Sequence, residues 1–235
     1  VKDIAAHLLD GNLRVISQMR DQYFGDPPGT IHSYQDLVDY LNRLNADFVQ
    51  AAKRVSPTLL TDLLESTGPL YMEQLRKLDP FKPAMFAVSW AGQTESPNWF
   101  HIAREYTEKW HHQQQIRDAV GKPGIMTKEF FAPLIETFMQ ALPHAYRNMY
   151  APDGTCVRVE VSTEVGNSWQ IVRTGNAWNF STGNITPHVT LTLDPDTAWK
   201  LFTKGLPAEE AKKKIQVVGN AAFSQPIFSM LAVMA

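Results

Sequence analysis

The stretch CVRVEVSTEV (residues 156–165) alternates apolar and polar residues, which is typical of a β-strand with one buried face. It directly follows the turn sequence YAPDGT (residues 150–155). Before this turn the apolar residues recur at helical spacing, and after it the strand alternation returns in several segments. We therefore predict two domains, one over residues 1–150 and one over residues 151–235.

The first of these domains has the pattern of a helical bundle, with apolar residues three and four positions apart. Ser33 and the pair Ser56-Pro57 are typical helix starts. The expected helices cover residues 1–24, a stretch after Ser33, and residues 57–78, 97–120 and 127–149. Short links between four or five helices favour an antiparallel up-down bundle. Because Val1 falls inside the first helical pattern, we expect native residues to precede it.

The second domain mixes strands with helices. Strand patterns continue in SWQIVRT (168–174) and HVTLTL (188–193), and Asp194-Pro195 then begins a helix. A last apolar helix is expected from about Asn220. This order predicts a small α+β domain, a meandering sheet with helices on one face. The predicted fold class is thus an α-helical bundle followed by an α+β domain.

The composition limits the classes of function. The chain has 22 Lys and Arg against 24 Asp and Glu, so it lacks the positive excess of proteins that bind nucleic acid or anionic membranes. No apolar run approaches the roughly 20 residues that span a bilayer. The single cysteine, Cys156, excludes an internal disulfide framework and favours a cytoplasmic location. We therefore expect small-molecule partners, and any metal would be held by His, Asp and Glu.

The helix expected at residues 97–120 carries an unusual set of polar residues. Its apolar stripe, expected to face the core, consists of Trp99, Ala103, Tyr106 and Trp110. The opposite side carries His101, Glu105, Glu108, His112 and Gln115. Glu108 and His112 are four residues apart, which places their Cβ atoms roughly 5–6 Å from each other. Both could therefore reach one ion at the ~2.0–2.2 Å that zinc prefers, whereas His111 points about 100° away.

A solvated helix face is the common explanation for such residues, and a Glu-x-x-x-His pair alone is a weak motif. Solvated faces, however, usually interleave Lys and Arg with Glu, and this one carries histidines and glutamine instead. A zinc site also needs a third protein ligand. The first helix offers His7, which lies off the apolar stripe beside Gly11, Arg14 and Gln18. We expect the two polar faces to meet in a cleft that the second domain covers.

Taken together, these segments resemble a known family. VKDIAAHLL (1–9) with EKWHHQQQIRDAVG (108–121) resembles the DinB-like metal-binding bundle, especially the branch of mycothiol-dependent maleylpyruvate isomerases. TLTLDPDTAWKLFTKG (190–205) and IQVVGNAAFSQPIFSMLAVM (215–234) are similar to the sterol-carrier-protein-like domain of that branch. The resemblance implies zinc, or another divalent metal, on His7, Glu108 and His112. Its open position would take water or the sulfur of a low-molecular-weight thiol such as mycothiol.

A thiol on such a metal loses its proton readily and could add to an activated double bond or displace a leaving group. The expected activity is therefore that of an isomerase or S-transferase. Two alternatives remain open at this stage. Water in the same position would make the protein a zinc hydrolase, and an apolar ligand held by the second domain would make it a non-enzymatic carrier.

Five further residues are candidates for supporting roles. Asp10, one turn after His7, is a candidate for orienting that ligand or nearby solvent. His101 shares the polar side of the central helix, and Gln115 stands where relatives often have aspartate. Members of the family use an arginine of the second domain to bind substrate. Arg158 and Arg173, both on expected strands, are the candidates here, although surface charge is the commoner explanation for any single arginine.

Overall fold

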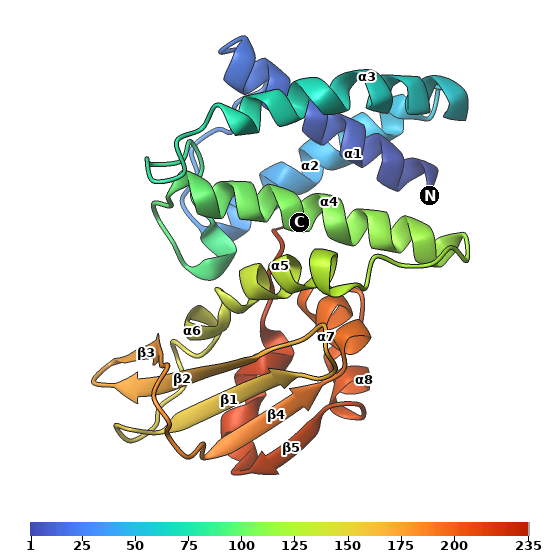
Figure 1. The fold of residues 1–235 in the computed structure, drawn as a ribbon. Coiled ribbons are helices and arrows are strands. Elements are labelled where there is room, and N and C mark those ends of the chain that lie inside the picture. Colours follow the sequence, from blue (N-terminus) through green and yellow to red (C-terminus); the bar gives the residue numbers. More distant parts are fainter. Residues whose placement is uncertain (235) are drawn as a thin grey trace.

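The computed structural model describes residues 1–234 and shows a mixed α/β protein with a five-stranded sheet (Figure 1). The helices are α1 (Lys2–Val15), α2 (Tyr34–Ala52), α3 (Pro57–Arg76), α4 (Asn98–Ala119), α5 (Lys128–Met139), α6 (Leu142–Ala145), α7 (Pro195–Phe202) and α8 (Ala208–Lys212). A π-helical turn, η1 (Ile16–Arg20), continues α1, and two 3₁₀ segments are η2 (Ser89–Ala91) and η3 (Ala221–Ser229). None of the helices within residues 1–234 is both long and apolar enough to cross a membrane.

Two helices of the bundle begin where their capping residues predict. Ser33 and Asp36 form a capping box, in which each side chain accepts a hydrogen bond from the backbone N–H of the other, at 3.1 and 2.9 Å. At the start of α3, Ser56 Oγ accepts from Leu59 N at 3.2 Å, and Pro57 occupies the first turn, where its missing N–H costs nothing. Local sequence therefore sets these boundaries.

Two expected helices are wrong in extent or type. The helix expected at residues 127–149 breaks after Met139, because Pro143 cannot donate a backbone hydrogen bond back to that turn. Pro143 instead lies in the first turn of the short helix α6. The segment from Asn220 forms the 3₁₀ helix η3 rather than an α-helix, and it contains Pro226, which removes a further backbone donor.

The sheet is not a simple meander, which corrects the expected topology. Its strands are β1 (Cys156–Val161), β2 (Ser168–Thr174), β3 (Ala177–Phe180), β4 (Val189–Leu193) and β5 (Gln216–Gly219). Their order is β3-β2-β1-β4-β5, with β1 and β4 parallel and the other neighbours antiparallel. After β3 the chain crosses over and adds β4 on the free edge of β1. This pairing buries the apolar faces of both strands, which periodicity alone does not reveal.

A single large core connects the helical end to the sheet. Trp110 of α4 contacts Phe131 of α5 and Trp199 of α7, with ring centroids 5.8 Å apart in both pairs. Phe138 of α5 also meets Phe202 of α7 at 6.5 Å. Helix α5 thus lies between α4 and the sheet (Figure 1). Because one side of α4 is fixed by this core, its other side is presented to α1 in a defined orientation.

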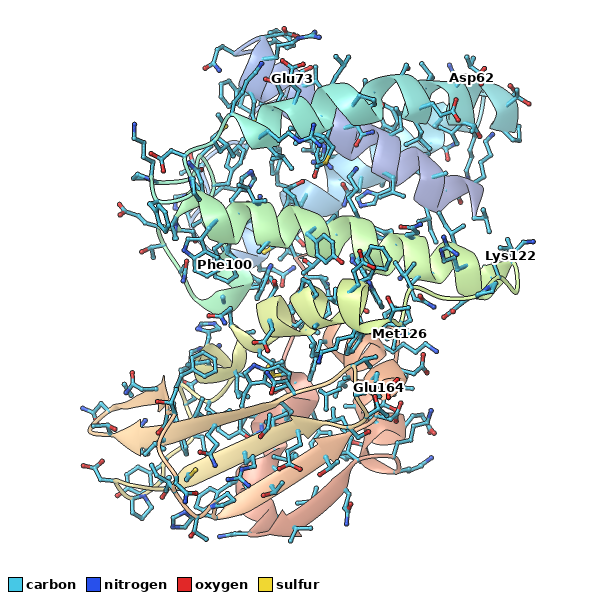
Figure 2. The ribbon with its side chains drawn as sticks, viewed as in Figure 1. Asp62, Glu73, Phe100, Lys122, Met126 and Glu164 are labelled. Carbon is cyan, nitrogen blue, oxygen red and sulfur yellow. The ribbon has the colours of Figure 1, made fainter. Side chains whose placement is uncertain are left out.

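The expected apolar stripe of α4 is wrong at Trp99, whose side chain is 44% exposed. The neighbouring Phe100 is buried instead, with only 1% of its surface exposed. Figure 2 places Phe100 at the start of α4, whereas charged residues such as Asp62 and Lys122 project from the periphery. The stripe fails at Trp99 because the core lies on the side of α4 that carries Phe100 and Trp110.

Candidate metal site

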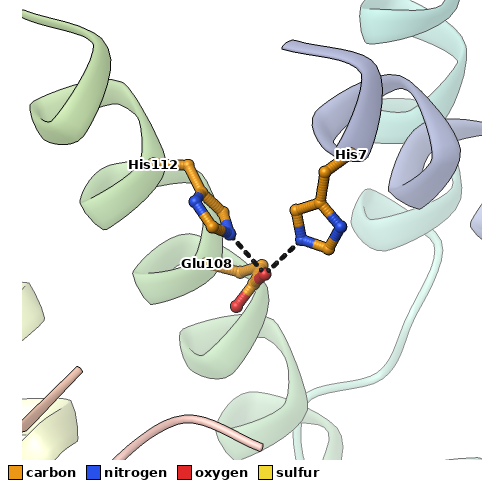
Figure 3. A group of neighbouring side chains, drawn as sticks. All are labelled: His7, Glu108 and His112. Carbon is orange, nitrogen blue, oxygen red and sulfur yellow. Dashed lines mark hydrogen bonds and ion pairs between the residues drawn. The ribbon is translucent and has the colours of Figure 1, made fainter. Parts of the chain in front are cut away.

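Three side chains from two helices converge on one point (Figure 3). His7 extends from α1, and Glu108 and His112 extend from adjacent turns of α4. Glu108 Oε1 lies 2.9 Å from His7 Nε2 and 3.0 Å from His112 Nε2. One ligand atom from each residue lies within 4.8 Å of the others, so the group could hold a metal ion. Two imidazoles and one carboxylate are ligands that Zn²⁺ binds in proteins.

The side chain of Lys109 holds α1 in register with α4. Its ammonium donates to the Leu8 carbonyl at 3.2 Å and to Asn12 Oδ1 at 2.6 Å, both on α1. It also lies 4.5 Å from the ring centroid of Tyr71 on α3, a cation–π distance. Because Lys109 follows Glu108 directly, these contacts fix the height of His7 relative to the carboxylate.

The charge state of Glu108 suits a metal ligand. Burial alone would raise its pKa, but the hydrogen bonds with His112 and His7 outweigh this effect and hold the pKa well below the usual value. The side chain keeps 38% of its surface exposed, and this surface opens onto the cavity described below. Glu108 is therefore an ionised carboxylate at neutral pH.

The hydrogen bond between His112 and Gln115 indicates which ring nitrogen of His112 is available to a cation. His112 Nδ1 lies 2.8 Å from Gln115 Oε1, and an amide oxygen can only accept, so Nδ1 carries the proton. In a neutral ring Nε2 then presents a lone pair to Glu108 Oε1 at 3.0 Å. With a proton also on Nε2 the ring donates a hydrogen bond to Glu108, and without that proton Nε2 and the carboxylate oxygen can bind one cation together. The donor set therefore fits a cation, and Gln115 orients the imidazole for it.

His111 lies beside this group without belonging to it. Its Nδ1 donates to the Thr107 carbonyl at 2.9 Å, and its ring lies 3.9 Å from that of His112, centroid to centroid. Burial lowers the pKa of His111 to about 4, so the ring is neutral. It packs against His112 and restricts the rotation of that ring.

Two members of the metal group formed by His7, Glu108 and His112, namely His7 and Glu108, line a cavity of about 800 Å³ between α1, α2 and α4. The side of α1 that carries His7, Gly11, Arg14 and Gln18 lines this cavity, so the two polar faces do meet as expected. The expected cover is wrong in part, because the sheet end of the chain contributes only residues 232–234 to the lining (Figure 1). The aromatic core of α5 and α7 holds the sheet on the other side of α4. Residues 83–90 therefore cover most of the cavity in place of the sheet.

A second polar cluster lines the cavity one turn from Glu108. Glu105 accepts from Arg104 Nη2 at 3.1 Å and from the Tyr71 hydroxyl at 2.9 Å. Arg104 Nη2 also donates to His101 Nδ1 at 2.6 Å. Burial and the Arg104 charge lower the pKa of His101 to about 4, so His101 is neutral and carries its proton on Nε2. Arg104 was missed in the sequence, although its spacing of four residues from Glu108 could have indicated it.

The remaining candidates pair with other residues or lie on the sheet, and their roles stay predictions. Asp10 pairs with Arg14, at 3.0 Å between Oδ2 and Nη2, and no hydrogen bond joins it to His7 within the described chain. Arg158 lies in a separate depression on the sheet, 3.8 Å from Glu160. Arg173 is buried on β2, away from the lining of the cavity. Strand alternation places these two arginines on the sheet, whereas the cavity lies beyond α4.

Arg14 and Arg104 line the cavity in their place.

No family model matches the chain, and no curated protein matches it. The resemblance to maleylpyruvate isomerases therefore stays a prediction. The functional argument rests on the geometry of His7, Glu108 and His112.

Proposed function

We propose that this protein is a zinc-dependent enzyme that uses a low-molecular-weight thiol, such as mycothiol, as an isomerase or S-transferase of the maleylpyruvate isomerase type. In this proposal α1–α4 form a DinB-like bundle and the sheet end is the sterol-carrier-like module. The supporting observation is that His7, Glu108 and His112 converge on one point, and that two of them, His7 and Glu108, line a cavity. Structural zinc sites use four protein ligands, whereas catalytic sites use three and keep one position open.

A divalent metal on these residues would lower the pKa of a thiol at its open position and so supply a thiolate nucleophile. Glu108 contributes one negative charge and the two imidazoles none, so the site would keep net positive charge. Gln115 orients His112, and Lys109 sets the position of α1. Trp90 and Phe86 also line the cavity and give it apolar surface.

The location of the cavity weakens the carrier alternative. That alternative places an apolar ligand in the sheet end of the chain. The depression there measures about 380 Å³ and includes polar residues such as Arg158, Ser168 and Gln170. The cavity of about 800 Å³ lies among the helices instead, next to the metal group. A hydrolase would use the same three ligands with water in the open position.

Metal analysis followed by a thiol titration tests the proposal. We expect one equivalent of zinc per chain in the wild type and in His32→Ala, which alters an exposed histidine outside the group. The variants His7→Ala and His112→Ala should lose it. Cobalt-substituted protein should then gain a thiolate-to-metal absorption band when mycothiol or cysteine is added. Zinc retained by both ligand variants, or a cobalt spectrum unchanged by thiols, would refute the proposal.

A further inference from the structure

We infer that the substrate of this cavity is an amphipathic anion, with an acidic group one to two helical turns from the metal and an apolar body beyond it. This inference rests on the proposed function and specifies its substrate class. The size of the cavity is the first argument. A volume of about 800 Å³ lies near the upper end of the range of roughly 300–1,000 Å³ for small-molecule sites. A short diacid would leave most of it unfilled.

The cavity is also elongated. Along α1 and its continuation η1 the lining runs from His7 to Met19, and along α4 it runs from Glu108 back to Asn98. At 1.5 Å per residue these stretches measure roughly 18 and 15 Å. The metal group lies at one end of both stretches, so a ligand whose reactive atom reaches the metal must extend along the helices to fill the rest.

The far end of the cavity is apolar. Its lining there includes Val15, Met19, Leu37, Leu41, Leu44 and Met85. Residues 232–234 close this region, and the segment is held by a hydrogen bond from Ala232 N to the Phe202 carbonyl at 2.9 Å. A hydrocarbon body would lose its contact with water here, whereas a polar body would lose hydrogen bonds that leucine and methionine cannot replace.

The charges along the cavity select an anion. Arg14 lies seven residues from His7, and Arg104 lies four residues from Glu108, so both are one to two turns from the metal group. The lining has three positive side chains, the third being Lys109, and two negative ones, Glu105 and Glu108. Asp10, which pairs with Arg14 behind the lining, brings the negative charges to three, so these charges balance. A divalent metal on His7, Glu108 and His112 would therefore give this part of the protein a net positive charge. An acidic group is therefore attracted to the middle of the cavity, and an ammonium group is repelled.

Isothermal titration calorimetry with simple probes tests the inference on the zinc-loaded protein. We expect decanoate to bind at least 100-fold more tightly than butyrate, because six additional methylene groups become buried. Decanoate should also bind at least tenfold more tightly than decylammonium. Equal affinity for decanoate and butyrate would refute the apolar body, and equal affinity for decanoate and decylammonium would refute the anionic group.

Two pairs of variants locate the binding within the cavity. Leu41→Asn should weaken decanoate binding at least tenfold, whereas Leu59→Asn, at a half-exposed leucine on α3, should leave it unchanged. Arg14→Met should weaken it, whereas Arg43→Met, at an arginine paired with Asp26 outside the lining, should not. If all four variants bind decanoate as the wild type does, the inference is wrong.

Zinc content separates this inference from the proposed function. Full zinc occupancy without preferential decanoate binding would overturn the substrate class and leave the metal site intact. If the wild type binds no zinc, the proposed function fails, and decanoate titration of the metal-free protein then decides whether the cavity takes an amphipathic anion.

Discussion

Replacing Gln115 by leucine removes the hydrogen-bond acceptor of His112 and leaves all three metal-binding side chains in place. The bond from His112 Nδ1 to Gln115 Oε1 measures 2.8 Å and fixes the tautomer whose Nε2 can bind a metal. Loss of such an outer hydrogen bond typically lowers metal affinity 10–100-fold. Because Gln115 is partly exposed, water can replace part of the bond, so we expect a decrease of about tenfold for zinc, or about 1.4 kcal/mol.

Competition with a chromophoric chelator measures this change. Gln113→Leu is the matched control, because Gln113 lies on the same helix but is exposed and outside the metal group. Gln115→Glu should retain or increase the affinity, since a carboxylate also accepts from Nδ1 and adds negative charge. If Gln115→Leu binds zinc as tightly as the wild type, then Gln115 does not set the tautomer of His112 and the argument from its lone pair fails.

Two further predictions concern Lys109 beside the metal group and Asp194 at the start of α7. Lys109→Met keeps most of the side-chain volume but removes both hydrogen bonds to α1. It should therefore lower the free energy of unfolding by about 1–3 kcal/mol and weaken zinc binding. Urea unfolding and metal titration measure these two effects, and unchanged values in both would contradict the role of Lys109 in positioning α1. Asp194→Ala removes the N-cap of α7 and should cost about 1 kcal/mol at pH 7. Burial raises the pKa of Asp194, but the hydrogen bonds from Thr197 outweigh this effect, so the pKa in the folded state is below 3.8. The ionised carboxylate therefore stabilises the fold above pH 3.8, and this stabilisation is lost as the pH falls through the folded-state pKa. The difference between wild type and Asp194→Ala in urea unfolding should therefore shrink as the pH falls below 3.8, and a difference independent of pH would show that the ionised carboxylate is not responsible.

The sequence alone determined features that depend on neighbouring residues. Ser33 and Ser56 predict two helix starts because a cap uses backbone groups only two or three residues away. The alternation in residues 156–161 predicts a strand because successive side chains point to opposite faces. In the same way, a spacing of four residues places Glu108 and His112 on one face of a helix. The fold class, helices followed by an α+β arrangement of strands and helices, follows from these patterns.

Only the tertiary structure decided which of these elements meet. His7 and Glu108 are 101 residues apart, and their contact depends on how α1 packs against α4. Packing between distant segments also decides the parallel pairing of β1 with β4. The burial of both sides of α4 depends on such packing as well. Local spacing is fixed by the geometry of the backbone, but contacts between distant segments depend on which apolar faces can be buried together. For this reason Arg14 and Arg104, which are unremarkable in the sequence, line the cavity, whereas Arg158 and Arg173 do not.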